Sequence, residues 1–96
     1  MQDSFNDRPV RLDKWLWAAR FFKTRSLAAE AISGGKVHVN GSRVKPSRGV
    51  NRGDELEITK GAIHFTVVVT ALSERRGPAK TAEALYEETE ASRQRR

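Results

Sequence analysis

Residues 11–41, RLDKWLWAARFFKTRSLAAEAISGGKVHVNG, decide the fold because the spacing of their apolar side chains changes once along the stretch. Over residues 12–22 the apolar positions recur every three or four residues, which predicts an amphipathic helix. Thr24 is a good helix cap and Gly34-Gly35 can end a helix, so a second helix is expected over residues 25–33. The first part of the stretch therefore predicts two consecutive helices.

After the glycines the apolar period falls to two, which is typical of strands. Residues 36–39 form a short alternating segment, and Asn40-Gly41 is a strong signal for a tight hairpin. Further strands are expected over residues 56–58 and 63–70, and a third helix over residues 79–91. The expected fold class is α+β: two N-terminal helices packed on a small, mostly antiparallel sheet, plus a C-terminal helix.

The chain length predicts one small domain with two appendages. Its 96 residues are too few for a catalytic domain beside a binding domain. We expect a polar N-terminal arm at residues 1–9, a compact folded domain at 10–75, and a C-terminal helix with a short basic tail at 76–96.

Positive charge is concentrated in one half of the chain. The formal net charge is +6, but residues 8–52 hold eleven Lys and Arg against only Asp13 and Glu30, a net +9. Residues 53–96 carry a net −1. A surface that served solubility alone would mix both signs, so this segment predicts a polyanionic partner.

The same sequence offers little for catalysis, metal binding or membrane insertion. It has no cysteine, and His38 and His64 lack the spacing of metal ligands. No nucleophile motif or phosphate-cradling glycine loop is present, so we expect neither an enzyme nor a cofactor. No targeting signal or apolar span is visible, which predicts a cytoplasmic protein without membrane contact. We expect a monomer.

The junction between the two helices is the candidate binding site. Arg20, Lys23 and Arg25 lie there, although a helix N-terminus disfavours cations. A bound phosphate would resolve this conflict, because free backbone N–H groups, the Thr24 hydroxyl and the basic side chains could all contact it. The alternative is that these long side chains extend into water.

Lys14, Trp17 and Phe21 fall opposite the apolar stripe of the first predicted helix. Aromatic side chains beside a cation could stack on unpaired bases. Packing beneath another segment is the alternative that we favour, because it is the usual fate of tryptophan.

Several ordered motifs resemble the RNA-binding domain first known from small-subunit ribosomal protein S-four. They cover about residues 10–59: RLDKWL at 11–16, KTRSLA at 23–28, GKV at 35–37, VNG at 39–41, VKPS at 44–47 and GD at 53–54. The longer strings at 11–28 and 34–41, with RRGPAKTAEALYEET at 75–89, are similar to the bacterial heat-shock protein 15 family. Members of that family usually continue into a longer basic C-terminal extension, whereas this sequence stops at SRQRR.

The resemblance implies a stress-response protein that binds ribosomal RNA on free large ribosomal subunits still carrying peptidyl-tRNA and helps to recycle them. It implies an RNA face made of Arg11, Lys14, Arg20, Lys23, Thr24, Arg25, Lys36, Asn40 and Lys45. It also implies a framework of Leu12, Leu16, Leu27, Ile32, Val37, Val39 and Ile58. Asn40 is the weakest member of the RNA face, because Asn40-Gly41 is typical of a turn.

Three other functions stay open at this point. The chain resembles small ribosome-quality-control factors that carry the same domain and assist the tailing of nascent chains. It also resembles accessory domains of RNA-modifying enzymes, although its length argues against that. General nucleic-acid binding, including weak DNA binding, is the third.

Overall fold

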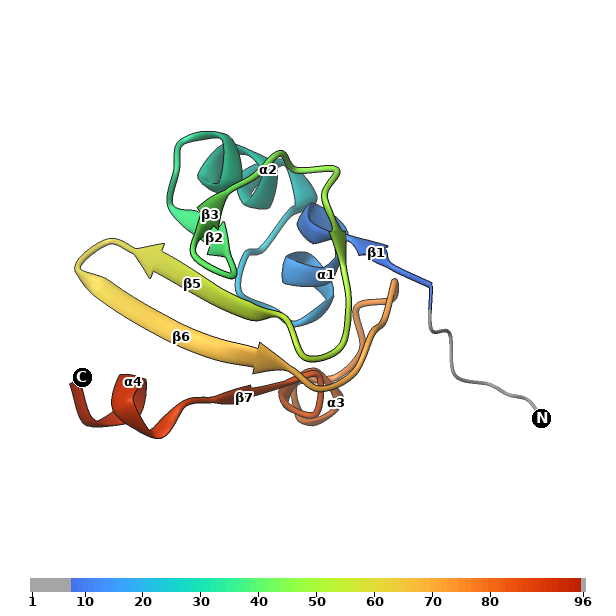
Figure 1. The fold of residues 1–96 in the computed structure, drawn as a ribbon. Helices are drawn as coiled ribbons and strands as arrows, with labels where there is room; N and C mark the ends of the chain where they lie inside the picture. The colour runs from blue at the N-terminus through green and yellow to red at the C-terminus, as the bar shows by residue number, and fades with distance from the viewer. Residues whose placement is uncertain (1–7, 96) are drawn as a thin grey trace.

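The computed structural model describes residues 8–95 as a small α+β fold, as the sequence predicts (Figure 1). The elements in chain order are β1 (Val10–Arg11), α1 (Leu12–Ala18), α2 (Arg25–Ser33), β2 (Val37–Val39), β3 (Ser42–Arg43), β4 (Gly49–Val50), β5 (Glu55–Lys60), β6 (Ile63–Val69), α3 (Ala79–Glu83), β7 (Tyr86–Glu88) and α4 (Glu90–Arg95). Residues 1–7, most of the predicted arm, and Arg96 lie outside the described part. The predicted division at residues 9 and 75 stays a prediction.

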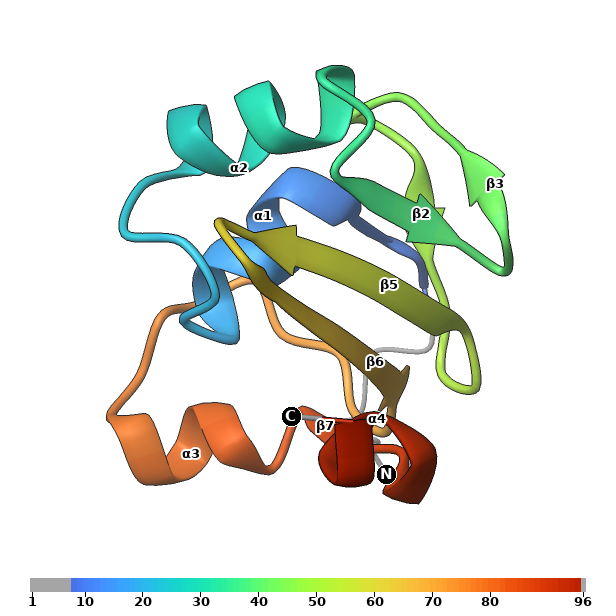
Figure 2. The ribbon, with the colours of Figure 1, turned by 90° about the vertical axis from the view of Figure 1, so that its left-hand side faces the viewer.

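A five-stranded antiparallel sheet in the order β3-β2-β5-β6-β7 forms the centre, and β1 pairs with β4 in a separate two-stranded sheet. The register of the five-stranded sheet places Val37 opposite Ile58 and Leu56 opposite Val67, so the apolar positions of β2, β5 and β6 share one face. Figure 2 looks onto the opposite, outer face of β5 and β6, with α1 behind them and α2 along the upper side. The fold therefore covers one face of the sheet with α1 and leaves much of the other open.

The core lies between α1 and the inner face of the sheet. Trp15 and Leu16 of α1 are fully buried, as are Leu56 of β5 and Val67 of β6. The buried indole keeps a hydrogen-bond partner, since Trp15 Nε1 donates to the carbonyl oxygen of Ala71 at 3.0 Å. This contact ties the first helix to the segment that follows β6.

Helix α1 ends earlier than the periodicity predicts, at Ala18 instead of residue 22. Arg20 adopts a left-handed backbone with φ 68°, which no α-helix continues through. The turn sends Phe21 into the core, where its ring centroid lies 4.7 Å from that of Tyr86 and 6.4 Å from that of Trp15. The packing interpretation of Phe21 is therefore confirmed, and Trp17 is half-buried against the same core.

The second helix and the hairpin follow the prediction closely. Thr24 caps α2, with its Oγ1 accepting from the backbone N–H of Leu27 at 3.0 Å, and α2 spans Arg25–Ser33. Asn40 and Gly41 have φ values of 51° and 84°, as a type I′ turn requires. One framework prediction is wrong: Leu27 is 45% exposed, because it lies on the outer side of α2.

The single C-terminal helix predicted over residues 79–91 is also wrong. The chain forms α3, then β7, which pairs with β6 through Val67–Glu88 and Val69–Tyr86, and then α4. Strand β6 would otherwise leave an unpaired edge, and pairing it outweighs the helical preference of an Ala- and Glu-rich segment. Buried Ser92 of α4 accepts from the Thr66 N–H and donates to Glu88, which fixes α4 beside β6.

Two arginines hold the connection between α1 and α2. Half-buried Arg76 donates through Nη1 to the carbonyl oxygens of Trp17 at 2.8 Å and Phe22 at 2.9 Å. In return, Arg20 donates through Nε and Nη2 to the carbonyl oxygen of Gly77. This reciprocal pair positions the segment that carries Lys23 and Thr24.

We expect Arg76→Met to lower the free energy of unfolding by about 2 kcal/mol, because two part-buried carbonyls lose a charged donor. Urea unfolding followed by tryptophan fluorescence measures the change. Arg75→Met, which removes the same charge from an exposed neighbour, is the matched control. Equal unfolding midpoints for the two variants would contradict this role of Arg76.

Candidate nucleic-acid interface

Two arginines face one buried carboxylate at the starts of α1 and α2. We call this group, which consists of Arg11, Asp13 and Arg25, the Asp13 cluster. Asp13 is only 5% exposed. Arg11 donates Nε to its Oδ1 at 3.1 Å and Nη2 to its Oδ2 at 3.0 Å, the two-point geometry typical of a strong arginine–carboxylate pair. Arg25 Nη2 lies 3.9 Å from the same Oδ1. A single buried acid therefore faces two exposed arginines, Arg11 at the end of β1 and Arg25 at the start of α2.

The Asp13 cluster explains how α2 tolerates a cation at its first residue. The first turn of α2 contains no acid, and Arg25 stands directly after the Thr24 cap. The negative charge that this end of the helix favours comes instead from Asp13 on the neighbouring helix. The sequence interpretation missed that Asp13 compensates the charge of Arg25, although the Arg11-x-Asp13 spacing was a visible signal that this acid pairs with arginine.

The environment of Asp13 favours its charged form. Burial opposes the charge, but the hydrogen bonds from Arg11, the charges of Arg11 and Arg25, and the backbone N–H of Lys14 outweigh it. Together they hold the pKa of Asp13 below its ordinary value. Its carboxylate is therefore ionised at neutral pH and keeps both arginines in place.

The loop before β4 lies against the same helix start. The backbone N–H groups of Leu12 and Asp13 donate to the carbonyl oxygens of Arg48 and Pro46. This brings exposed Lys45, a predicted site residue, near the start of α1, and with it exposed Arg48.

The remaining predicted site residues divide into two groups. Lys23 is exposed beside the Thr24 cap, Lys14 Nζ pairs with Glu74 at 3.2 Å, and Arg20 is engaged with Gly77. Lys36 and Asn40 belong to the other end of α2 and to the hairpin, so the structure does not place them in the Asp13 cluster.

Asn40 has a structural task, in line with its weak ranking. Its Nδ2 donates to Asp54 Oδ1 at 3.1 Å, and its Oδ1 accepts from the Glu55 N–H at 2.9 Å. Both contacts tie the β2–β3 turn to the start of β5.

Residues 8–95 contain neither a metal site nor a membrane-spanning helix. In this range, no group of three or more His, Asp or Glu side chains is placed to hold a metal ion. No helix there is long and apolar enough to cross a membrane.

Comparison with known proteins places the Asp13 cluster within a recognised domain, because residues 10–56 match the S4 domain. Heat shock protein 15 of Escherichia coli (strain K12) is 56% identical over 87 residues, which cover 91% of this chain and 65% of that protein. The trimeric structure of Vibrio cholerae Heat Shock Protein 15 superimposes with a TM-score of 0.89 at 49% identity, covering 92% of this chain and 89% of that one. This chain belongs to the heat shock protein 15 family.

The chain is also similar to a protein with a different name. The RQC P-site tRNA stabilizing factor of Bacillus subtilis (strain 168) is 40% identical over 65 residues, covering 68% of this chain and 76% of that protein. The present chain spans 65% of the length of the E. coli family member. The predicted family membership and fold are therefore confirmed.

Because folding lowers the pKa of the Asp13 carboxyl, its contribution to stability is present above the ordinary aspartate value and is lost on acidification. We expect the free energy of unfolding to fall as the pH drops below about 4, and Asp13→Asn to flatten this dependence. Urea unfolding between neutral and acidic pH measures it. Glu30→Gln, which removes an exposed acid from α2, is the control and should keep the wild-type profile.

Proposed function

We propose that this chain is a non-enzymatic, cytoplasmic RNA-binding protein that binds ribosomal RNA on free large ribosomal subunits, including stalled ones that carry peptidyl-tRNA. It helps to recycle or rescue these subunits under heat stress. The observation that carries the proposal is the Asp13 cluster, which holds two exposed arginines beside the capped start of α2 within the S4 domain match.

The geometry suits phosphate groups. The first N–H groups of α2 point out of the helix start, and Lys23, Arg25 and Arg11 surround this end with positive charge. Arg11 and Arg25 keep exposed side chains although both face Asp13, with 51% and 46% of the side-chain surface accessible. Their remaining N–H donors can contact an RNA backbone without displacing the buried acid.

The proposed RNA face starts at this cluster and extends over the surrounding basic residues. It comprises Arg11, Lys14, Arg20, Lys23, Thr24, Arg25, Lys36 and Lys45, with Asn40 fixing the turn. Arg48 joins it because its backbone is bonded to the start of α1. Exposed Leu27, one turn along α2 from Thr24, adds an apolar contact for a ribose or base.

The name of the B. subtilis relative favours a second candidate within the same class. A factor that holds tRNA in the P site would use the same cationic face against tRNA and neighbouring ribosomal RNA. It would support nascent-chain tailing instead of subunit recycling. The two candidates differ in whether peptidyl-tRNA is required for binding.

We expect Lys23→Gln with Arg25→Gln to weaken binding to a structured ribosomal RNA fragment and to reduce the log–log salt slope by up to about two units, because two phosphate contacts are lost. Fluorescence anisotropy over a salt series measures both quantities. The control pair, Lys80→Gln with Arg93→Gln, removes the same charge from α3 and α4 and should leave the slope unchanged. Duplex DNA competing as well as the RNA fragment would contradict specific RNA binding.

We expect the full chain to co-sediment with free large subunits in sucrose gradients and more strongly with subunits that carry P-site peptidyl-tRNA. Small subunits are the control. Binding only to subunits that carry peptidyl-tRNA, with none to empty large subunits, would favour P-site tRNA stabilisation over recycling. Binding to naked RNA but never to subunits would contradict the ribosomal proposal.

A further inference from the structure

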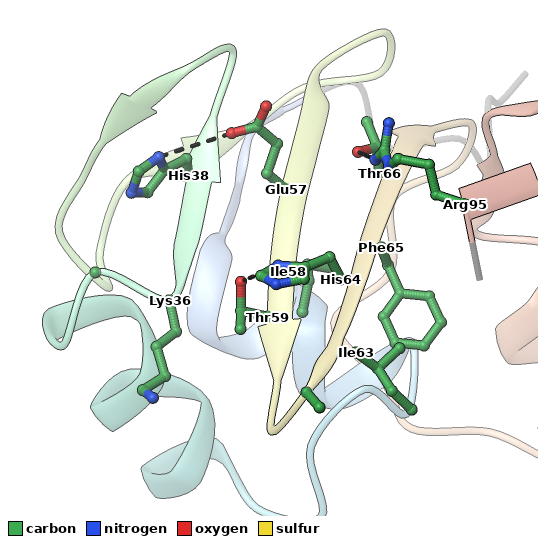
Figure 3. Close-up of a pocket in the computed structure, with 12 residues that line it drawn as sticks. Lys36, His38, Glu57, Ile58, Thr59, Ile63, His64, Phe65, Thr66 and Arg95 are labelled. Atoms are coloured by element: carbon green, nitrogen blue, oxygen red, sulfur yellow. Dashed lines mark hydrogen bonds and ion pairs between the residues drawn. The ribbon is translucent and has the colours of Figure 1, made fainter. Parts of the chain in front are cut away.

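The outer face of the five-stranded sheet contains a groove of about 640 Å³ that is separate from the Asp13 cluster. We call it the sheet groove; its polar lining is Lys36, His38, Glu57, Thr59, His64 and Arg95, with Thr66 between the last two (Figure 3). Its volume lies within the usual range for small-ligand sites. None of the contacts described for the proposed RNA face uses the two histidines or Arg95.

The floor of the sheet groove consists of side-chain pairs that cross between elements. His38 Nδ1 lies 3.7 Å from Glu57 Oε1, and Thr59 Oγ1 lies 3.0 Å from His64 Nδ1. Arg95 of α4 reaches over β6 to donate Nη2 to Thr66 Oγ1 at 3.3 Å. Figure 3 shows the first two pairs side by side on neighbouring strands, with Lys36 on one side of them and Arg95 on the other.

The charges of the sheet groove favour an anionic occupant. Two cationic side chains, Lys36 and Arg95, line it. The one acid of the lining, Glu57, already faces His38. Lys36 stands directly before β2, and Arg95 is bonded to Thr66 of β6, two strand spacings or about 10 Å away, so cations lie on both sides of the histidine floor.

The uncharged surface between these cations fits a nucleobase better than an acidic peptide. His64 is exposed, and a flat imidazole can stack on a base, while threonine hydroxyls can bond to base edges. At the hairpin end the groove is lined by Ile63, a residue that is 49% exposed and offers apolar surface to a base or ribose. An acidic peptide would use the cations but would gain little from this floor.

We propose that the sheet groove is a second RNA-contact site, which takes unpaired nucleotides with their phosphates on Lys36 and Arg95 and a base over His64. This inference rests on the proposed function, because the RNA bound there also provides the nucleotides that enter the sheet groove. The Asp13 cluster then binds the backbone of structured RNA, and the sheet groove captures an adjoining single-stranded segment. Lys36, predicted as part of the RNA face, is a member of this second site.

The test is photo-crosslinking of the full chain to a short oligouridine that carries one 4-thiouridine. We expect crosslinks in the tryptic peptides 53–60 and 61–75, which hold Thr59 and His64. His64→Ala and Arg95→Gln should each reduce the crosslink yield at least about threefold. Arg93→Gln is the matched control, because Arg93 lies on the same helix but outside the groove lining and should leave the yield unchanged.

Three outcomes would overturn the inference. Crosslinks confined to peptides from α1 and α2, or equal yields from the Arg95 and Arg93 variants, would remove the sheet groove from RNA binding. Polyglutamate that competes as well as unlabelled oligouridine would show selection for charge and not for bases. In each case, salt-dependent binding of structured RNA that is weakened by the Lys23 and Arg25 substitutions would still support the proposed function. Failure of the chain to bind any RNA would contradict both the proposed function and this inference.

Discussion

The buried indole of Trp15 is the contact on which the rest of the fold depends. It lies fully buried between α1 and the sheet, and its N–H bond to Ala71 joins the S4 domain match to the C-terminal segment. Phe21 stacks on it and Tyr86 meets it edge-on, so the aromatic cluster is shared by α1, the α1–α2 connection and β7. Loss of this cluster would separate the helices that carry the cations from the sheet that supports them.

Within this fold, Asp13 compensates the positive charges of Arg11 and Arg25 at the helix starts. The chain places arginines where helix electrostatics disfavours them, and one buried acid from the neighbouring helix makes the arrangement stable. Because Asp13 occupies only part of each guanidinium, the arginines stay available at the surface. The exposed guanidinium groups of Arg11 and Arg25 therefore form a defined cationic surface at the starts of α1 and α2.

The C-terminal third has a different role from the helix predicted for it. By pairing β7 with β6 and laying α4 beside that strand, it completes the sheet and brings Arg95 over the outer face. Its arginines also support the helix connection, since Arg76 bonds to Trp17 and Phe22. The same segment therefore stabilises the first cationic surface and forms one side of the sheet groove.

Local patterns in the sequence were sufficient for α2 with its Thr24 cap, the Asn40-Gly41 turn, the β6 strand and the α+β class. These features depend on neighbours within a few residues, and capping, left-handed turn residues and period-two alternation act at that range. The family resemblance, carried by ordered motifs over residues 10–59, was confirmed by the comparisons. Of the candidate site, the sequence indicated the residue types and the helix junction, but it offered only a bound phosphate or extension into water to explain a cation at Arg25, and not the buried acid Asp13.

The sequence by itself determined the elements whose signals are local and the segment in which positive charge gathers. Only the tertiary structure decided where α1 stops, that Phe21 is buried, that residues 86–88 form a strand, and that Asp13 faces two arginines. Each of these depends on a partner distant in sequence or on another element: Tyr86 for Phe21, the open edge of β6 for β7, and Arg25 for Asp13. Propensity and periodicity contain no information about such partners, because packing and pairing energies arise only once the chain has brought them together.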